Sequence, residues 1–242
     1  MTIGAVIVGV LIVVVVGIGQ LGNKVSGTLK DPAMAYPASI LDGTNLGKAD
    51  APVTLEVWED FQCPVCGRYT RDVEPVLVSQ YVNEGILRIV HHDLAILGRG
   101  GADDESKLAA SGAYCANTQG KYWAYAHWVY ANQDGENAGG FRRDRLVAIA
   151  EKAGLEPASF RTCLDDPATV AAVAESTTKG TQLGINSTPT MYIGGQQLVG
   201  LKSAAELGAL IDAELAKSSA SPSASPAASP AASPAASAST TP

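Results

Sequence analysis

Two cysteines in the sequence FQCPVC, Cys63 and Cys66, are the residues with the clearest chemistry. Thiols at this spacing can close to a disulfide and open again, which is the chemistry of thiol–disulfide exchange. Pro64 and Val65 lie between the two sulfurs. We therefore predict a redox-active pair in which all four residues of the CPVC loop belong to the catalytic site.

Half of a zinc site has the same spacing, but it requires two further ligands. Cys115 and Cys163 are isolated in the sequence, and no histidine has ligand spacing to either of them. His91 and His92 come at the end of a predicted strand, and we expect both to lie at the surface. A purely structural Cys63–Cys66 disulfide is a second alternative, although a Cys-Pro-x-Cys loop at a helix start favours reactivity. The prediction is no metal and no cofactor.

A strand and a helix must position this pair. Val53–Trp58 is β-branched and aromatic, as strands are, and the apolar residues after Cys66 follow helical spacing to about Gly85. Cys63 would then lie at the helix N-terminus, with Pro64 at the first helical position, where its missing N–H costs nothing. Free N–H groups and the helix dipole would lower the pKa of Cys63, and the more buried Cys66 would resolve mixed disulfides.

Four segments carry a family resemblance: DFQCPVC at 60–66, ANTQGKYWAYAHWVY at 116–130, GINSTPTMYIGGQQLVG at 184–200 and SAAELGALIDAEL at 203–215. With them the chain resembles the DsbA-like thiol–disulfide oxidoreductases of the thioredoxin superfamily, of the actinobacterial membrane-anchored type. The resemblance covers about residues 51–216 and implies an α/β, thioredoxin-like fold. Helical patterns at 107–118, 121–133, 142–153 and 167–180 fit a helical insertion at about residues 95–180.

The resemblance also implies roles for further residues. The cis-proline of the family carries over onto Thr188-Pro189, where an ordinary trans turn is the alternative. A cis turn would present the Thr188 backbone beside Cys63 for pairing with a substrate segment, and Thr188 would tune the redox poise. Related actinobacterial proteins have a second, structural disulfide, which here would join Cys115 and Cys163; an even cysteine count in an exported chain agrees with it.

The chain departs from the family at the buried acid. Many relatives carry a glutamate six residues before the first cysteine, and that position here is Val57. On a strand with a period of two, Glu56 points away from the site if Val57 points into it. Proton transfer would then fall to Glu59, Asp60 or water; the alternative is that both glutamates are solvated surface residues.

Ile3–Gly19 is an unbroken apolar run that predicts a membrane helix and contact with the lipid bilayer; a buried core helix is the alternative. No basic residue precedes the run and no cleavage site closely follows it, so we expect an uncleaved anchor over residues 1–20. Lys24 and Lys30, read by the positive-inside rule, would place the domain in the cytoplasm, but two lysines are a weak bias. We expect a single-pass protein of the cell membrane with an extracytoplasmic catalytic domain.

Composition divides the rest of the chain. Residues 21–50 contain several Gly and Pro and are predicted to be a linker, and residues 51–216 form the catalytic domain. Residues 217–242 are almost entirely Ser, Ala, Pro and Thr, which cannot bury apolar surface and predict a disordered tail.

The leading functional hypothesis is a monomeric disulfide donor that oxidises exported proteins with free cysteines and is reoxidised by a membrane protein. A net charge of −7 without a basic cluster argues against nucleic acid as a partner. A reductase or isomerase remains the alternative, because the sequence does not fix the redox potential. A third alternative is an anchored binding or chaperone-like module whose cysteines only crosslink it.

Overall fold

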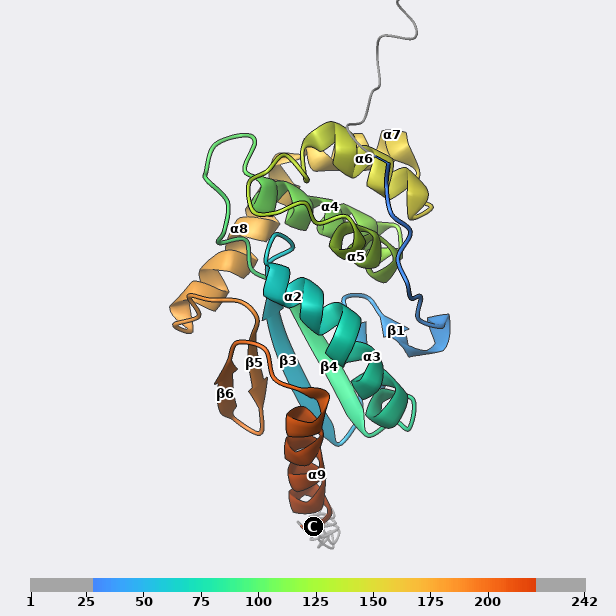
Figure 1. Ribbon diagram of the computed structural model, residues 1–242, viewed down its shortest axis with the longest axis vertical. Helices are drawn as coiled ribbons and strands as arrows, with labels where there is room; N and C mark the ends of the chain where they lie inside the picture. The colour runs from blue at the N-terminus through green and yellow to red at the C-terminus, as the bar shows by residue number, and fades with distance from the viewer. Residues whose placement is uncertain (1–27, 221–242) are drawn as a thin grey trace, which may run out of the picture.

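A six-stranded mixed sheet lies at the centre of the computed structural model, which describes residues 28–220 (Figure 1). The strand order is β1-β2-β4-β3-β5-β6. The central strands β3 and β4 are parallel, and each of the other neighbouring pairs is antiparallel. The strands are β1 Leu41–Asp42, β2 Asn45–Leu46, β3 Val53–Glu59, β4 Leu87–Asp93, β5 Thr190–Ile193 and β6 Gln196–Val199.

The segment before β3 is part of the sheet, although the sequence placed residues 21–50 in a linker. A 3₁₀ turn at Ala38–Ile40 leads into β1, and β2 pairs with β4. Gly43 adopts a positive φ of 59° in the turn between β1 and β2, and Leu46 is fully buried. The glycine that suggested a linker therefore serves a tight hairpin, which buries an apolar side chain.

One helical segment runs from the redox loop across the sheet (Figure 1). It consists of α2 Pro64–Arg68, a π-helical turn Tyr69–Val73, α3 Glu74–Leu77 and a second π-helical turn Val78–Val82. The side chains of Tyr69 and Leu77 are fully buried. The C-terminal helix α9, Ala204–Ala220, packs beside α3 with Leu207 and Ile211 fully buried. These two helical segments fix the position of the redox loop over β3 and β4.

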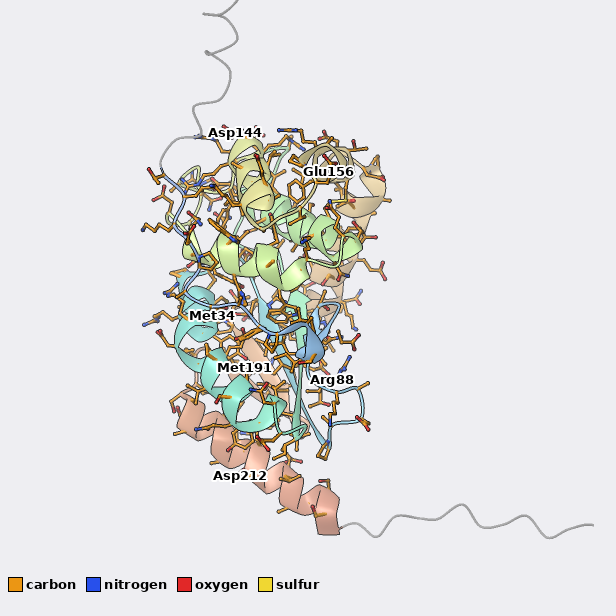
Figure 2. All side chains as sticks on the ribbon, turned by 90° about the vertical axis from the view of Figure 1, so that its right-hand side faces the viewer. Met34, Arg88, Asp144, Glu156, Met191 and Asp212 are labelled. Atoms are coloured by element: carbon orange, nitrogen blue, oxygen red, sulfur yellow. A yellow bond between two sulfur atoms is a disulfide. The ribbon has the colours of Figure 1, made fainter. Side chains whose placement is uncertain are left out.

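The helical insertion forms a second layer beyond one end of the sheet (Figure 1). Its helices are α4 Glu105–Thr118, α5 Tyr122–Ala131, α6 Arg143–Lys152, α7 Pro157–Leu164 and α8 Pro167–Gln182. Four of them follow the predicted helices closely, whereas α7 was not predicted. Figure 2 shows this layer, marked by Asp144 and Glu156, at the opposite end of the molecule from Asp212 in α9.

The sheet register brings three strand ends together beneath the start of α2. Glu59 at the end of β3 pairs with Asp93 of β4, and Trp58 pairs with Thr190 at the start of β5. The residue before that start is Pro189. The loop that follows β3 and the loop that leads into β5 therefore meet at the same end of the sheet.

Within residues 28–220, no helix is both long and apolar enough to cross a membrane. The predicted anchor, Ile3–Gly19, lies outside these residues. So does most of the predicted tail, although α9 continues to Ala220 and includes its first four positions.

Candidate active site

The two cysteines of the redox loop occupy different environments. Cys63 is the N-cap residue of α2 and Pro64 occupies its first turn, as the sequence predicted. Both thiols are free; Cys63 is 5% exposed and Cys66 fully buried. Pro64 is exposed and Val65 half-buried. Cys63 is therefore the sulfur closer to solvent. In the described part of the chain, no three His, Cys, Asp or Glu residues are grouped to hold a metal ion.

The loop before β5 lies against Cys63. The Thr188-Pro189 peptide bond is cis, and the Thr188 carbonyl oxygen lies 3.3 Å from Cys63 Sγ, where it accepts a hydrogen bond from the protonated thiol. Pro189 is buried and Thr188 is partly exposed. The structure thus brings together all six residues that the sequence assigned to the site.

Hydrogen bonding and burial shift the pKa values of the two thiols in opposite directions. The Cys66 thiol, followed by the Thr188 side chain and the backbone N–H groups of Cys66 and Val65, lowers the pKa of Cys63 to about 6 against the opposing effect of burial. Burial, followed by the hydrogen bond to Cys63, raises the pKa of Cys66 well above its usual value. At neutral pH the pair consists of a thiolate at Cys63 and a thiol at Cys66.

Glu59 lies beneath the sulfurs and is only 1% exposed. The alternative of a solvated surface residue is wrong for Glu59, because the pleat of β3 turns it to the same buried face as Val57. Burial and the negative charge of Cys63 raise its pKa well above the usual value, and a hydrogen bond with Cys66 lowers it. The Glu56 side chain, on the other face, is 45% exposed. Of the two candidate carboxyl groups, that of Glu59 forms a hydrogen bond with Cys66, whereas Asp60 contacts Cys66 through its backbone.

His91 is buried as well, and the prediction of a surface position is wrong. It is 5% exposed, and its Nε2 lies 2.7 Å from Glu59 Oε2. The reason is that β4 continues to Asp93, so His91 lies inside the strand rather than at its end. His92 points to the opposite face, where its ring stacks on that of Trp58.

Asp60 connects the redox loop to the insertion. Its Oδ1 accepts hydrogen bonds from Gln62 N and Ser106 Oγ at 2.9 Å each. Its Oδ2 accepts from the backbone N–H groups of Ile96 and Leu97 at 2.9 and 3.0 Å. Because all four donors are satisfied by one buried carboxylate, Asp60 is better suited to holding the loop than to moving protons.

Gln133 is a residue of the site that the sequence did not reveal. It follows α5, and its Nε2 donates to the carbonyl oxygens of Phe61 and Cys63 at 2.8 and 2.9 Å. A Cβ atom at Gly67 would collide with this side chain, so the glycine leaves room for it. No local pattern marks Gln133, because its partners are more than 65 positions away in the sequence.

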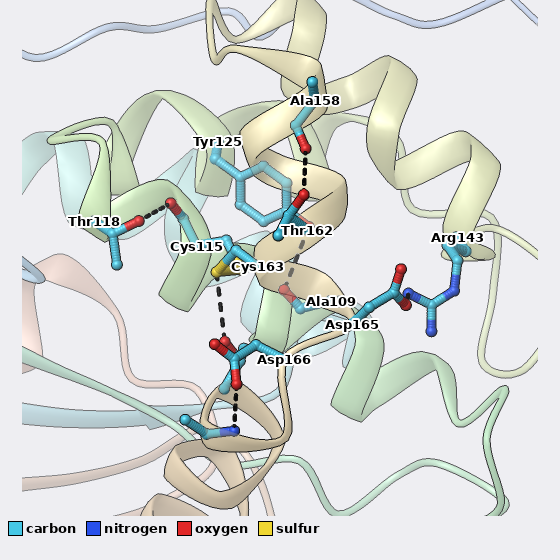
Figure 3. The surroundings of a disulfide bond; sticks show 12 residues. Ala109, Cys115, Thr118, Tyr125, Arg143, Ala158, Thr162, Cys163, Asp165 and Asp166 are labelled. Carbon is cyan, nitrogen blue, oxygen red and sulfur yellow. Dashed lines mark hydrogen bonds and ion pairs between the residues drawn. A yellow bond between two sulfur atoms is a disulfide. The ribbon is translucent and has the colours of Figure 1, made fainter.

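The other two cysteines lie away from the redox pair. Cys115 of α4 and Cys163 of α7 are joined by a disulfide within the helical layer (Figure 3). Thr118, one turn after Cys115, donates its hydroxyl to the Cys115 carbonyl oxygen at 2.8 Å. This bond connects two helices of the insertion and leaves Cys63 and Cys66 free.

The thioredoxin family model matches residues 41–213, which is more than half of the chain. The chain belongs to the thioredoxin family. The match begins at β1, inside the segment that the sequence assigned to a linker.

Individual relatives agree with this assignment. The probable disulfide bond formation protein D of Bacillus cereus is 23% identical over 189 residues, which are 76% of this chain and 84% of that protein. Curated Na⁺/H⁺ antiporters also match, but the chain spans only 24 to 26% of their length.

Solved structures show the same fold. The oxidised crystal structure of BdbD from Bacillus subtilis has a TM-score of 0.65 at 22% identity, covering 77% of this chain and 100% of that one. Wolbachia pipientis alpha-DsbA1 has a TM-score of 0.61 at 20% identity, covering 77% and 95%. The predicted thioredoxin-like fold with a helical insertion and the DsbA-like resemblance are confirmed, as is the enzyme class of thiol–disulfide oxidoreductase.

Proposed function

We propose that this chain donates disulfides to exported proteins, with Cys63 as the sulfur that exchanges with the substrate. The observation that carries the proposal is the asymmetry of the pair: Cys63, beside the Thr188 carbonyl, has a pKa of about 6, whereas Cys66 is buried beneath it as a thiol. A sulfur with a low pKa is a good leaving group, and this favours release of the oxidised substrate.

In the donor direction, a substrate thiolate attacks Cys63 Sγ in the oxidised pair, and the Cys66 sulfur leaves and takes a proton. A second thiolate of the substrate then attacks the substrate sulfur that is bonded to Cys63 in the mixed disulfide. The Cys63 sulfur leaves as a thiolate. The substrate loses two electrons to the pair. The Thr188 carbonyl lies where the backbone of an extended substrate segment can pair with it.

The charge on Cys63 favours donation over reduction. A thiolate stabilised in the folded protein stabilises the reduced form, and the corresponding disulfide becomes more oxidising. The names of the relatives agree, since the protein from Bacillus cereus is called a probable disulfide bond formation protein. A reductase or isomerase would carry out the same exchange with a weaker preference for the thiolate.

The proposal includes a location and partners. The exchange takes place outside the cytoplasm, with residues 3–19 anchored in the bilayer and a membrane protein reoxidising Cys63 and Cys66. The protein acts as a monomer and does not bind nucleic acid. The support is the apolar N-terminal run, the acidic charge and the names of the relatives.

Trapping experiments test the assignment of Cys63. A Cys66→Ala variant of the full chain, mixed with an oxidised cysteine peptide, should accumulate a mixed disulfide at Cys63 that mass spectrometry detects. Cys63→Ala should not accumulate one. The Cys115→Ala/Cys163→Ala double variant serves as the control and should transfer its disulfide to a reduced dithiol peptide like the unaltered chain. Trapping at Cys66 instead of Cys63 would contradict the proposal.

A further inference from the structure

A row of buried polar side chains leads away from Glu59 on the side opposite the sulfurs. Glu59 Oε2 lies 2.7 Å from His91 Nε2, and His91 Nδ1 lies 2.5 Å from the Tyr122 hydroxyl. That hydroxyl donates to Asp93 Oδ1 at 2.9 Å. The four side chains come from β3, β4 and α5, and their atoms form a continuous chain of hydrogen bonds.

The hydrogen positions in this row follow from its last bond. Because Tyr122 gives its hydrogen to Asp93, its oxygen accepts one from Nδ1–H of His91. The neutral imidazole then has a lone pair on Nε2, which accepts from the protonated Glu59 carboxyl. Each donor therefore faces the next acceptor, in the order Glu59 to Asp93.

The far end of the row reaches solvent. The Asp93 side chain is 17% exposed, whereas those of Glu59 and His91 are 1% and 2% exposed. Asp93 and Tyr122 line a cavity of about 220 Å³ together with Tyr114. A proton that arrives at Asp93 can thus pass to water, whereas Cys66 itself is fully buried.

We propose that His91, Tyr122 and Asp93 relay the proton of Cys66 between Glu59 and solvent. His91, Tyr122 and Asp93 act through Glu59 and are positioning residues rather than catalytic ones. The proposal requires only the enzyme class, and holds for either direction of exchange.

The step is balanced during reoxidation by a disulfide such as oxidised glutathione. The Cys63 thiolate attacks it, one glutathione thiolate leaves, and a mixed disulfide remains at Cys63. Glu59 passes its proton along the row to Asp93 and then accepts the proton of Cys66. The Cys66 thiolate attacks Cys63 Sγ, the second glutathione thiolate leaves, and the pair has lost two electrons to the glutathione disulfide.

The charges along the row agree with this direction. Burial raises the pKa of Glu59 well above its usual value and that of Asp93 to about 6, and burial lowers the pKa of His91. The row thus holds a proton at Glu59 and accepts one at Asp93 near neutral pH. The other titratable groups that interact electrostatically with the row are Tyr36, Asp60, Cys63, Cys66, Tyr69, Glu74, His92, Tyr125 and Tyr130.

Tyr122→Phe in the full chain removes the central hydroxyl and retains the ring. Quenched-flow oxidation by oxidised glutathione, with alkylation and mass spectrometry, separates mixed-disulfide formation at Cys63 from ring closure by Cys66. We expect ring closure to slow by about 10- to 100-fold, while mixed-disulfide formation changes by less than about twofold. Tyr125→Phe is the matched control: it removes a buried hydroxyl from the same helix that donates to the Ala109 carbonyl oxygen.

Asp93→Asn gives a second test if Tyr122→Phe does not fold. Because Cys63 does not titrate in the mixed disulfide, ring closure in the unaltered chain should accelerate as pH rises through about 6, where Asp93 becomes a carboxylate. This acceleration should be absent in Asp93→Asn. If ring closure in Tyr122→Phe is as fast as in Tyr125→Phe, or if Asp93→Asn keeps the acceleration of the unaltered chain near pH 6, the relay is overturned. Neither result would change the enzyme class.

Discussion

At the scale of single residues, the chemistry depends on which sulfur carries the negative charge. The Cys66 thiol contributes most to lowering the pKa of Cys63, ahead of Thr188 and the backbone N–H groups at the start of α2. The helix start alone would have suggested that the backbone dominates. The buried partner sulfur is thus both the resolving group and the main stabiliser of the thiolate.

Substitutions of Cys66 test this order of effects. Cys66→Ala removes the donor to the Cys63 sulfur, so the pKa of Cys63 should rise from about 6, whereas Cys66→Ser retains a hydroxyl donor and should stay closer to 6. The measurement is the pH dependence of thiolate absorbance or of alkylation at Cys63. Equal pKa values in the two variants would show that the backbone and Thr188 hold the charge.

At the scale of elements, residues of the helical insertion hold the redox loop in place through hydrogen bonds. Asp60 connects the loop to α4 through Ser106, and Gln133 at the end of α5 holds the carbonyl oxygens of the loop. The Cys115–Cys163 bond joins α4 to α7 and closes a loop with a sequence separation of 48. The contacts that hold the redox loop thus come from Ser106 and Gln133, whereas the Cys115–Cys163 bond holds α7 against α4.

Removal of the second disulfide should destabilise the fold without altering the redox site. The Cys115→Ala/Cys163→Ala variant should lose about 2 to 4 kcal/mol of the free energy of unfolding, the usual range for removal of a disulfide. Chemical denaturation measures the loss. The potential of the Cys63–Cys66 pair should stay the same, and a shifted potential would show that the bond also supports the redox loop.

Local signals in the sequence predicted β3, the helix after Cys66 and four helices of the insertion. They did not predict α7, whose eight residues are too few for a strong periodic pattern, or β1 and β2, whose two residues each pair only through tertiary contacts. The sequence predicted the redox loop, and the family resemblance implied the cis-proline turn. It could not reveal the burial of Glu59 and His91 or the position of Gln133, because neighbours distant in the sequence create these environments.

At the scale of the whole molecule, the two ends of the described chain lie far apart. The residues before β1 run along the insertion, where Lys30 N donates to Asn132 Oδ1 at 2.8 Å, and α9 ends at the opposite end (Figure 1). Cys63 lies between these ends, at the junction of the sheet and the helical layer. The described chain therefore begins on the side of the insertion and ends on the side of α9.

The stability of the reduced protein depends on pH through the Cys63 thiolate. The pKa of Cys63 is about 6 when folded, below its value in an unfolded chain, so the thiolate stabilises the reduced protein. This contribution is complete above the unfolded pKa of about 8.5 and is lost as the pH falls through about 6. At pH 7 it amounts to about 1.4 kcal/mol, equivalent to about 30 mV.

The equilibrium potential of the Cys63–Cys66 pair in the full chain, titrated against glutathione at pH 7, tests the donor function most directly. The Cys115–Cys163 bond is monitored separately by mass spectrometry. The donor function predicts a potential well above the value of about −270 mV found for thioredoxin and toward the value of about −120 mV found for DsbA. The reduced chain should also be more stable than the oxidised one. A potential at or below that of thioredoxin would contradict the donor function and identify a reductase.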